Sequence, residues 1–421
     1  MARNKTLTIA MCTSMFSEIN GTSKASRQLA FALAKYGHKL HIYAPNKPLN
    51  WQDDSKKTKN MFFHEFMAFK PPYSQEFNLP IPILEIVTSH LRKEVNEIDV
   101  VHAQTPCGMG FYAWAFARMI HVPKVITAHS PLFFYTKDIF GESGAAVLNR
   151  LFWVYEPLLY NQFDLRVAPT RSKKHFILYQ GFKQPILALS NGIEDRYFKK
   201  GNGERIRSKY KLGDKKVLLY LSRLAPEKNQ DVILCCFREI HKQVPESHFL
   251  IAGQGPLQEK LEKLIIDYHL EDAVTLAGFV PDDEVIDYYA AADLTTLWSK
   301  VEAQGLVLLE AMAQGTPSIG LYAMGIIDVI LHGKTGFLVK TEEEFISRTI
   351  QLFKDDSLTQ EFRTNCLKYI EYHRMERIVE MWTNIYWKLI NLYPKIVAQD
   401  IGPSYRKDWE QFTNQYPDYL F

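Results

Sequence analysis

Short apolar runs alternate with amphipathic stretches along most of the 421-residue chain. The apolar run at 7–11 predicts a buried strand, and apolar positions within 23–36 recur at helical spacing until Gly37 ends the stretch. A second strand is predicted at 39–45. Units of strand, helix and strand build doubly wound α/β domains, and a chain of this length predicts two such domains.

The most informative stretch runs from Ser299 to Gly320 and reads SKVEAQGLVLLEAMAQGTPSIG. It follows the apolar run 294–297 and predicts a strand, a polar loop, a buried helix, a loop and a strand. Glu310 lies in the middle of that helix and must meet a hydrogen-bond donor or a ligand hydroxyl, because an unpartnered buried carboxylate is costly. Glu302 precedes the helix start, where free amides and the helix dipole favour a phosphate. Carboxylates for hydroxyls and amides for phosphate suit a nucleotide-sugar.

Two histidines lie at other predicted strand ends, the edge at which ligands collect in open α/β sheets. His102 falls within the predicted strand 99–103, and His129 closes the run 124–129. For His102 we expect a structural role, with the ring bonded to a nearby backbone group.

Two cations lie at and just beyond the carboxyl end of the predicted strand 216–223, ahead of a predicted helix at 230–242. Arg223 and Lys228 are about one turn apart in this loop. A pair of cations in this place would neutralise a diphosphate.

These motifs resemble those of retaining glycosyltransferases with the GT-B fold, and of the large family 4 in particular. The spacing of Glu302 and Glu310 is similar to the family's E-x7-E pattern. The segment SRLAPEK resembles its G-R-L-x-x-x-K phosphate clamp, with Ser222 in the place of the glycine. The segment LIAGQGP, which contains Gly253, resembles its G-x-G-P turn, and Val280 falls where the family's base-contacting loop lies.

The first half looks most like the lipid-glycosylating, diacylglycerol glucosyltransferase-like branch of the family. The segments VVHAQTPCGMG and VPKVITAHSP resemble the H-x-x-T-P and T-x-H segments of enzymes that act on lipid or polyisoprenoid acceptors. Family members often carry a glycine pair in the first loop, whereas this chain has Asn20 and Gly21. An ordinary turn glycine remains an alternative for Gly21.

The resemblance implies an α/β GT-B fold: two Rossmann-like domains that face each other across a cleft, with a C-terminal helix crossing back to the first domain. We expect an acceptor-side domain at 1–197, a nucleotide-sugar-binding domain at 198–375, and returning helices at 376–421.

The resemblance also assigns roles to residues. Glu310 would bind ribose hydroxyls, Glu302 and the amides after it would hold the donor sugar and diphosphate, and His129 would contact the transferred sugar. The implied catalytic residues are His129, Glu302, Arg223 and Lys228. The implied donor-binding residues are Gly21, Arg223, Lys228, Gly253, Val280, Glu302, Ala303, Gln304, Gly305, Leu306 and Glu310.

The activity implied is transfer of a hexose, with UDP-glucose the expected donor, to a membrane lipid such as diacylglycerol with retained anomeric configuration. The leaving phosphate would itself take the acceptor proton. The chain has no D-x-D, so we expect neither a metal nor another cofactor. A polysaccharide or cell-wall precursor as acceptor, a nucleotide-sugar epimerase, and a silent binding protein remain as alternatives.

Composition and charge indicate where in the cell the protein works and which partners it can bind. The chain is 47% hydrophobic and 23% charged, as in ordinary globular proteins, and no window of about 18 uninterrupted apolar residues predicts a membrane span. Five scattered cysteines favour reduced thiols and a cytoplasmic location. A net charge of +3 argues against nucleic acid as a partner.

Residues 1–195 hold 22 Lys and Arg against 15 Asp and Glu, which gives +7 and leaves −4 for the rest. This asymmetry suggests peripheral contact with an anionic membrane, on the inner face, or a chance scatter of lysines.

Overall fold

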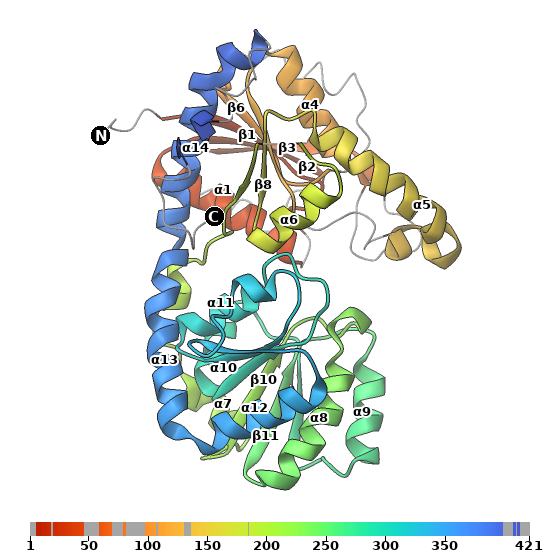
Figure 1. Ribbon diagram of the computed structural model, residues 1–421, viewed down its shortest axis with the longest axis vertical. Coiled ribbons are helices and arrows are strands. Elements are labelled where there is room, and N and C mark those ends of the chain that lie inside the picture. Colours follow the sequence, from red (N-terminus) through yellow and green to blue (C-terminus); the bar gives the residue numbers. More distant parts are fainter. Residues whose placement is uncertain are drawn as a thin grey trace. The chain divides into compact units, whose positions relative to one another are not determined.

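A computed structural model describes residues 6–17, 20–45, 59–69, 79–80, 97–106, 108–129, 136–183, 185–398, 407–409 and 411–412. The chain divides into two compact units (Figure 1). The first comprises residues 1–192 together with 375–421, and the second comprises residues 193–374. Each is built on a parallel sheet, as the alternating pattern predicts.

The first unit contains a seven-stranded sheet in the order β3-β2-β1-β6-β7-β8-β9, and each neighbouring pair is parallel. The predicted first strand is confirmed as β1. The strands are β1 Thr8–Cys12, β2 Lys39–Pro45, β3 Met61–Phe66, β6 Val100–Ala103, β7 Lys124–Thr127, β8 Leu165–Ala168 and β9 Ile186–Ala188, beside a small antiparallel pair, β4 Ala68–Phe69 and β5 Leu79–Pro80. The helices are α1 Gly21–Tyr36, α4 Met109–Met119, α5 Thr136–Tyr160, α6 Arg171–Tyr179 and α14 Met375–Val397.

The predicted C-terminal helix is α14, and it packs on the first unit, as expected. His38 Nε2 lies 2.9 Å from Thr383 Oγ1, and His102 Nδ1 lies 2.7 Å from Tyr386 Oη. The helix is amphipathic and buries residues such as Trp382 and Leu389. Of the predicted segment 376–421, residues 399–406, 410 and 413–421 lie outside the described part of the chain.

The second unit contains a six-stranded parallel sheet in the order β12-β11-β10-β13-β14-β15. Its strands are β10 Lys216–Leu221, β11 Ser247–Ala252, β12 Val274–Gly278, β13 Leu294–Leu297, β14 Ser318–Leu321 and β15 Gly336–Val339. Its α-helices are α7 Gly203–Lys209, α8 Gln230–Gln243, α9 Gln258–Asp267, α10 Val285–Ala291, α11 Leu306–Ala313, α12 Glu342–Lys354 and α13 Asp356–Ile370. Short 3₁₀ helices are η3 Asp195–Phe198, η4 Pro226–Lys228, η5 Ile326–Asp328 and η6 Glu371–His373.

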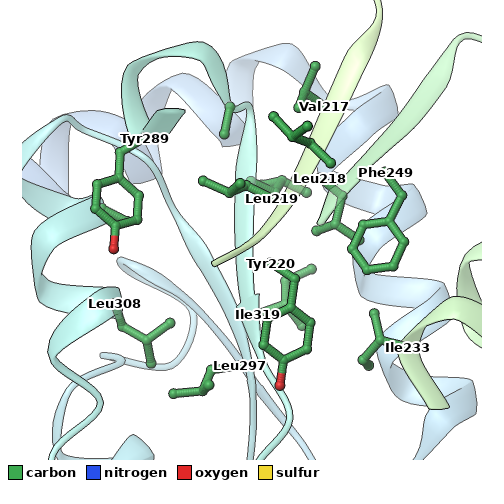
Figure 2. Packing of buried hydrophobic residues seen from close by; sticks show 14 of the residues in the cluster. Val217, Leu218, Leu219, Tyr220, Ile233, Phe249, Tyr289, Leu297, Leu308 and Ile319 are labelled. Carbon is green, nitrogen blue, oxygen red and sulfur yellow. The ribbon is translucent and has the colours of Figure 1, made fainter. Parts of the chain in front are cut away.

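The core of the second unit lies between this sheet and its helices. Figure 2 shows side chains from the middle of β10 gathered with Ile233 of α8, Phe249 of β11 and Leu308 of α11. Strands buried on both faces need continuous apolar sequence, which is why 216–221 reads as an unbroken apolar run after its first lysine. This core fixes the strand ends from which the loops of the candidate site start.

One further property concerns membranes. Within the part of the chain that the structure describes, no helix is both long enough and apolar enough to cross a lipid bilayer.

Candidate active site

An ion pair joins two loops of the second unit that are 74 positions apart in sequence. The Lys228 Nζ contacts the Glu302 Oε1, and both side chains are mostly buried, with 20% and 15% of their surface exposed. Lys228 ends η4, which follows β10, while Glu302 follows β13. The structure therefore brings together a predicted phosphate-binding cation and a predicted donor-binding carboxylate.

The core holds the Lys228 loop in place through Tyr220. The Tyr220 hydroxyl donates to the Lys228 carbonyl and accepts from the Trp298 amide at 3.0 Å. Asn229 adopts a left-handed backbone conformation, and its Nδ2 donates to the Trp298 carbonyl at 3.0 Å. Sequence reasoning missed both Tyr220 and Asn229 as positioning residues, since one looks like a core aromatic and the other like an ordinary turn residue. Together they fix the ends of β10 and β13 against each other.

The other predicted cation, Arg223, lies nearer to solvent. Its Nη2 is 2.6 Å from the Glu227 Oε1, with 40% of the Arg223 side chain exposed. An exposed pair of this kind contributes at most about 1 kcal/mol, so an incoming anion can displace Glu227 at little cost. Arg223 thus lies at the surface in an exposed ion pair, whereas Lys228 is held in a mostly buried one by Glu302.

Helix α11 begins directly after the Glu302 loop. Gly305 precedes it in a left-handed conformation, with φ 71° and ψ 56°, and has no side chain to cap the first amides. Gly325 packs on the same loop, since a Cβ there would lie 2.3 Å from the Glu302 carbonyl oxygen. Ala303, Gln304, Gly305 and Leu306 therefore lead into a helix N-terminus that favours an anion.

Glu310 lies on the buried face of α11 and is only 1% exposed. The Tyr289 hydroxyl donates to its Oε2 at 2.9 Å, which confirms the expected hydrogen-bond donor. Burial, and next the Glu310 charge, raise the pKa of Tyr289 well above its usual range, so the tyrosine stays protonated and keeps donating. The ribose-binding role of Glu310 stays a prediction.

The glycine turn after β11 packs backbone against backbone on the Arg223 loop. Gly253 has φ 141°, and a Cβ there would lie 1.8 Å from the Ser222 carbonyl oxygen. The Ser222 amide donates to the Ala252 carbonyl at 3.0 Å. Val280, two residues beyond the end of β12, is buried. The close contact with Ser222 therefore explains why a glycine is needed at position 253, apart from any role in donor binding.

A buried hydrogen-bonded chain links the two candidate histidines in the first unit. The His129 Nε2 donates to the Gln104 Oε1 at 2.8 Å, and the Gln104 Nε2 lies 3.0 Å from the His102 Nε2. His102 also lies 2.8 Å from the Thr127 Oγ1 and, through Nδ1, 2.7 Å from the Tyr386 hydroxyl. The backbone partner expected for His102 is wrong: its partners are side chains, one of them on α14.

Burial sets the charge of these rings. Burial, and then Lys173, lower the pKa of His129 to about 4, while burial, and then His129, lower that of His102 to about 3. Burial also lowers the pKa of Lys173 to about 7, against the nearby charge of Glu156. At neutral pH His129 is therefore uncharged, and with its proton on Nε2 it offers Nδ1 as an acceptor for a hydroxyl.

We expect stability to fall on acidification between about pH 6.5 and pH 4. In this window the folded state binds fewer protons than the unfolded state, so the free energy of unfolding falls as pH falls. Each of the two histidines should lower the free energy of unfolding by on the order of 2 kcal/mol over this window. Urea unfolding at about pH 7 and about pH 5 measures the loss. His129→Gln should shrink it, while the exposed His121→Gln should not; equal losses in all three proteins would contradict the assignment.

The predicted donor-binding residue Gly21 is the first residue of a helix, whereas the sequence pattern predicts a loop at this position. Helix α1 begins at Gly21 and not at Ser23, because the Asn20 Oδ1 accepts from the Ser23 amide at 2.9 Å and caps the first turn. A Cβ on Gly21 would meet open space. The loop expected at Gly21 is therefore wrong, and the glycine amide belongs to the first turn of α1.

Comparison with known proteins identifies the two units. A model described as Glycosyltransferase Family 4 matches residues 19–197, and one described as Glycosyl transferases group 1 matches residues 202–371. The N-acetyl-alpha-D-glucosaminyl L-malate synthase of Bacillus anthracis is 26% identical over 89% of this chain and 96% of that protein. The alpha-monoglucosyldiacylglycerol synthase of Streptococcus pneumoniae is 26% identical over 72% of this chain and 68% of that protein.

Solved structures agree on the fold. Anabaena HepE in complex with UDP superposes with a TM-score of 0.74 at 17% identity, over 90% of this chain and 99% of that one. A sucrose-phosphate synthase from Thermosynechococcus elongatus has a TM-score of 0.73 at 19% identity, over 91% and 99%. The chain is therefore a glycosyltransferase of the GT-B fold, with a Family 4 domain followed by a group 1 domain.

Proposed function

We propose that this glycosyltransferase moves glucose from UDP-glucose to a membrane lipid such as diacylglycerol, with retained anomeric configuration. The observation that carries the proposal is the Lys228–Glu302 ion pair at the loop that leads into α11. It places a fixed cation, a carboxylate and a helix N-terminus in one part of the second unit. A nucleotide diphosphate-sugar presents the matching groups: negative phosphate oxygens and sugar hydroxyls.

The cations act on the leaving group. As the bond between the anomeric carbon and the phosphate oxygen breaks, negative charge grows on the diphosphate, and Lys228 and Arg223 stabilise it. Lys228 is held by Glu302 before the donor binds, so its orientation costs little during the reaction. Arg223 exchanges Glu227 for phosphate. With no D-x-D in the sequence, we expect turnover without a divalent metal.

The acceptor proton goes to the leaving phosphate. The acceptor oxygen forms its bond to the anomeric carbon on the face from which the phosphate departs, and a phosphate oxygen takes the hydroxyl proton. His129 is uncharged and hydrogen-bonded through Nε2, which suits an acceptor for a sugar hydroxyl and not a general acid. We assign it the positioning of the transferred sugar.

Two relatives favour different acceptors. The relative from Streptococcus pneumoniae is named for a glucosyldiacylglycerol, and the basic first half of this chain suits an anionic lipid surface. The relative that matches more of this chain is named for a glucosaminyl L-malate, which makes a soluble hydroxy acid the second candidate. Polysaccharide or cell-wall precursors remain a third class.

Release of UDP tests the proposal. We expect release from UDP-glucose in EDTA to require anionic liposomes that contain diacylglycerol, and to disappear in Glu302→Ala and Arg223→Ala. Parallel reactions with L-malate and UDP-N-acetylglucosamine test the second candidate. Release that depends on malate and not on any lipid would replace the lipid acceptor, and release of a modified sugar without any acceptor would indicate an epimerase.

A further inference from the structure

Helix α5 of the first unit carries an exposed apolar stripe. Val147, Leu151, Val154 and Leu158 are 67%, 58%, 55% and 62% exposed. Their spacing of four, three and four residues places them within an arc of about 60° at about 100° per residue. Figure 1 shows α5, in gold, reaching beyond the sheet of its own unit. Four large aliphatic side chains in one exposed row indicate a surface that meets another apolar phase.

The opposite face of α5 packs on the first unit. Glu156 and Leu159 are buried there, on the side of the helix away from the stripe. Tyr155 is partly buried, with its hydroxyl donating to the Pro106 carbonyl at 3.3 Å. The stripe is thus the outer face of a helix whose inner face is already in place.

The aromatic and basic residues of α5, β8 and α6 divide between the core and the surface. Tyr160, Arg166 and Lys173 are buried and belong to the core. Trp153 and Leu158 are exposed, and Trp153 packs edge-on against Phe176 of α6 at 6.2 Å.

Charge distinguishes the possible occupants of this surface. Residues 145–183 contain six Lys and Arg (150, 166, 171, 173, 174 and 183) and two acids, Glu156 and Asp164, which gives +4. Across 147–160, a stretch described without gaps, Arg150 is the one exposed charged side chain. On the neighbouring α6, burial first and then the Arg171 charge lower the pKa of Lys174, so Arg171 and Lys174 lie near each other. The surroundings of the stripe are basic.

We propose that the α5 stripe, defined by Val147, Leu151, Val154 and Leu158, docks the enzyme on an anionic lipid bilayer. The aliphatic side chains would enter the acyl boundary while Arg150, with Arg171 and Lys174 of α6, would meet lipid phosphates. A second copy of the chain fits less well, because a two-fold contact would bring the same basic face against itself. The proposed lipid acceptor gives this docking its biological role, so the inference rests on the proposed function. Binding to lipid vesicles can nevertheless be measured without any catalysis.

Flotation of the full chain with vesicles tests the stripe. We compare wild type with Leu151→Glu/Leu158→Glu on phosphatidylcholine vesicles with and without phosphatidylglycerol. The matched control is Ile266→Glu, on α9 of the second unit, where the isoleucine is 60% exposed. We expect wild type and the control to float with anionic vesicles, less so as salt rises, and the double variant to bind at least about tenfold more weakly.

Three results would overturn the proposal: wild type that does not float, a double variant that floats like wild type, or a wild-type dimer by light scattering that the double variant loses. An unchanged melting temperature establishes that the double variant folds. UDP release with diacylglycerol in detergent micelles separates the two proposals. A double variant that releases UDP in micelles but not on vesicles would support docking through the α5 stripe. A wild type that releases no UDP in either system would contradict the proposed lipid glycosyltransferase activity.

Discussion

Lys228→Met is expected to lower kcat/KM for the donor by about 10²–10³-fold. The substitution keeps most of the side-chain volume and removes the charge that would stabilise the leaving diphosphate. It also leaves the Glu302 carboxylate without its lysine partner next to the phosphate site, so that negative charge opposes negative charge. Because the cation acts more strongly on the transition state than on the bound donor, the loss should be found mainly in kcat.

A second lysine of the same unit provides the control. Lys260 pairs with Asp231 and is 57% exposed, remote in sequence from the Glu302 loop. Lys260→Met should leave kcat/KM within about a factor of two, because exposed ion pairs contribute little. Equal losses in both variants would indicate a general effect of lysine removal, and an active Lys228→Met enzyme would remove Lys228 from the proposed chemistry.

Gly253→Ala is expected to destabilise the protein by about 3 kcal/mol or more. The new Cβ would lie 1.8 Å from the Ser222 carbonyl oxygen, so one of the two backbones must move, and φ 141° is unfavourable for alanine. The displaced loop carries Arg223, so activity should fall even where the protein still folds. Urea unfolding followed by circular dichroism measures the loss of stability.

Gly213→Ala separates steric conflict from backbone strain. Gly213 also has a positive φ, of 49°, but a Cβ there would meet nothing within 4 Å. The Gly213→Ala substitution should lower the free energy of unfolding by only about 1 kcal/mol, the penalty for an alanine in the left-handed conformation. If the two variants lose the same stability, the close contact between Gly253 and Ser222 does not exist in solution.

The periodic features of the fold follow from the sequence. The predicted strand at 294–297 coincides with β13, and the helix predicted at 230–242 differs from α8 by one residue at its end. Short apolar runs and amphipathic spacing define such elements locally. The sequence pattern predicts the start of α1 two residues late, at Ser23, although Asn20 is a favoured cap residue and signals the true start.

The partners of the site residues do not follow from the sequence. Lys228 meets Glu302, Glu310 meets Tyr289, and His102 meets Tyr386 at a separation of 284 positions. No periodicity encodes which polar group a buried residue finds across the fold. Motif resemblance singles out the loops of Lys228 and Glu302 as candidates, whereas the packing that brings these two distant loops together appears only in the structure.

Analysis of the sugar product formed from UDP-glucose in EDTA tests the proposed reaction as a whole. The enzyme, diacylglycerol and anionic vesicles are incubated with labelled donor, the lipid phase is extracted, and the anomeric proton coupling is measured by NMR. We expect labelled glucolipid in which glucose keeps the α configuration. A β-linked glucolipid would contradict the retaining mechanism, and label that remains entirely outside the lipid phase would contradict the lipid acceptor.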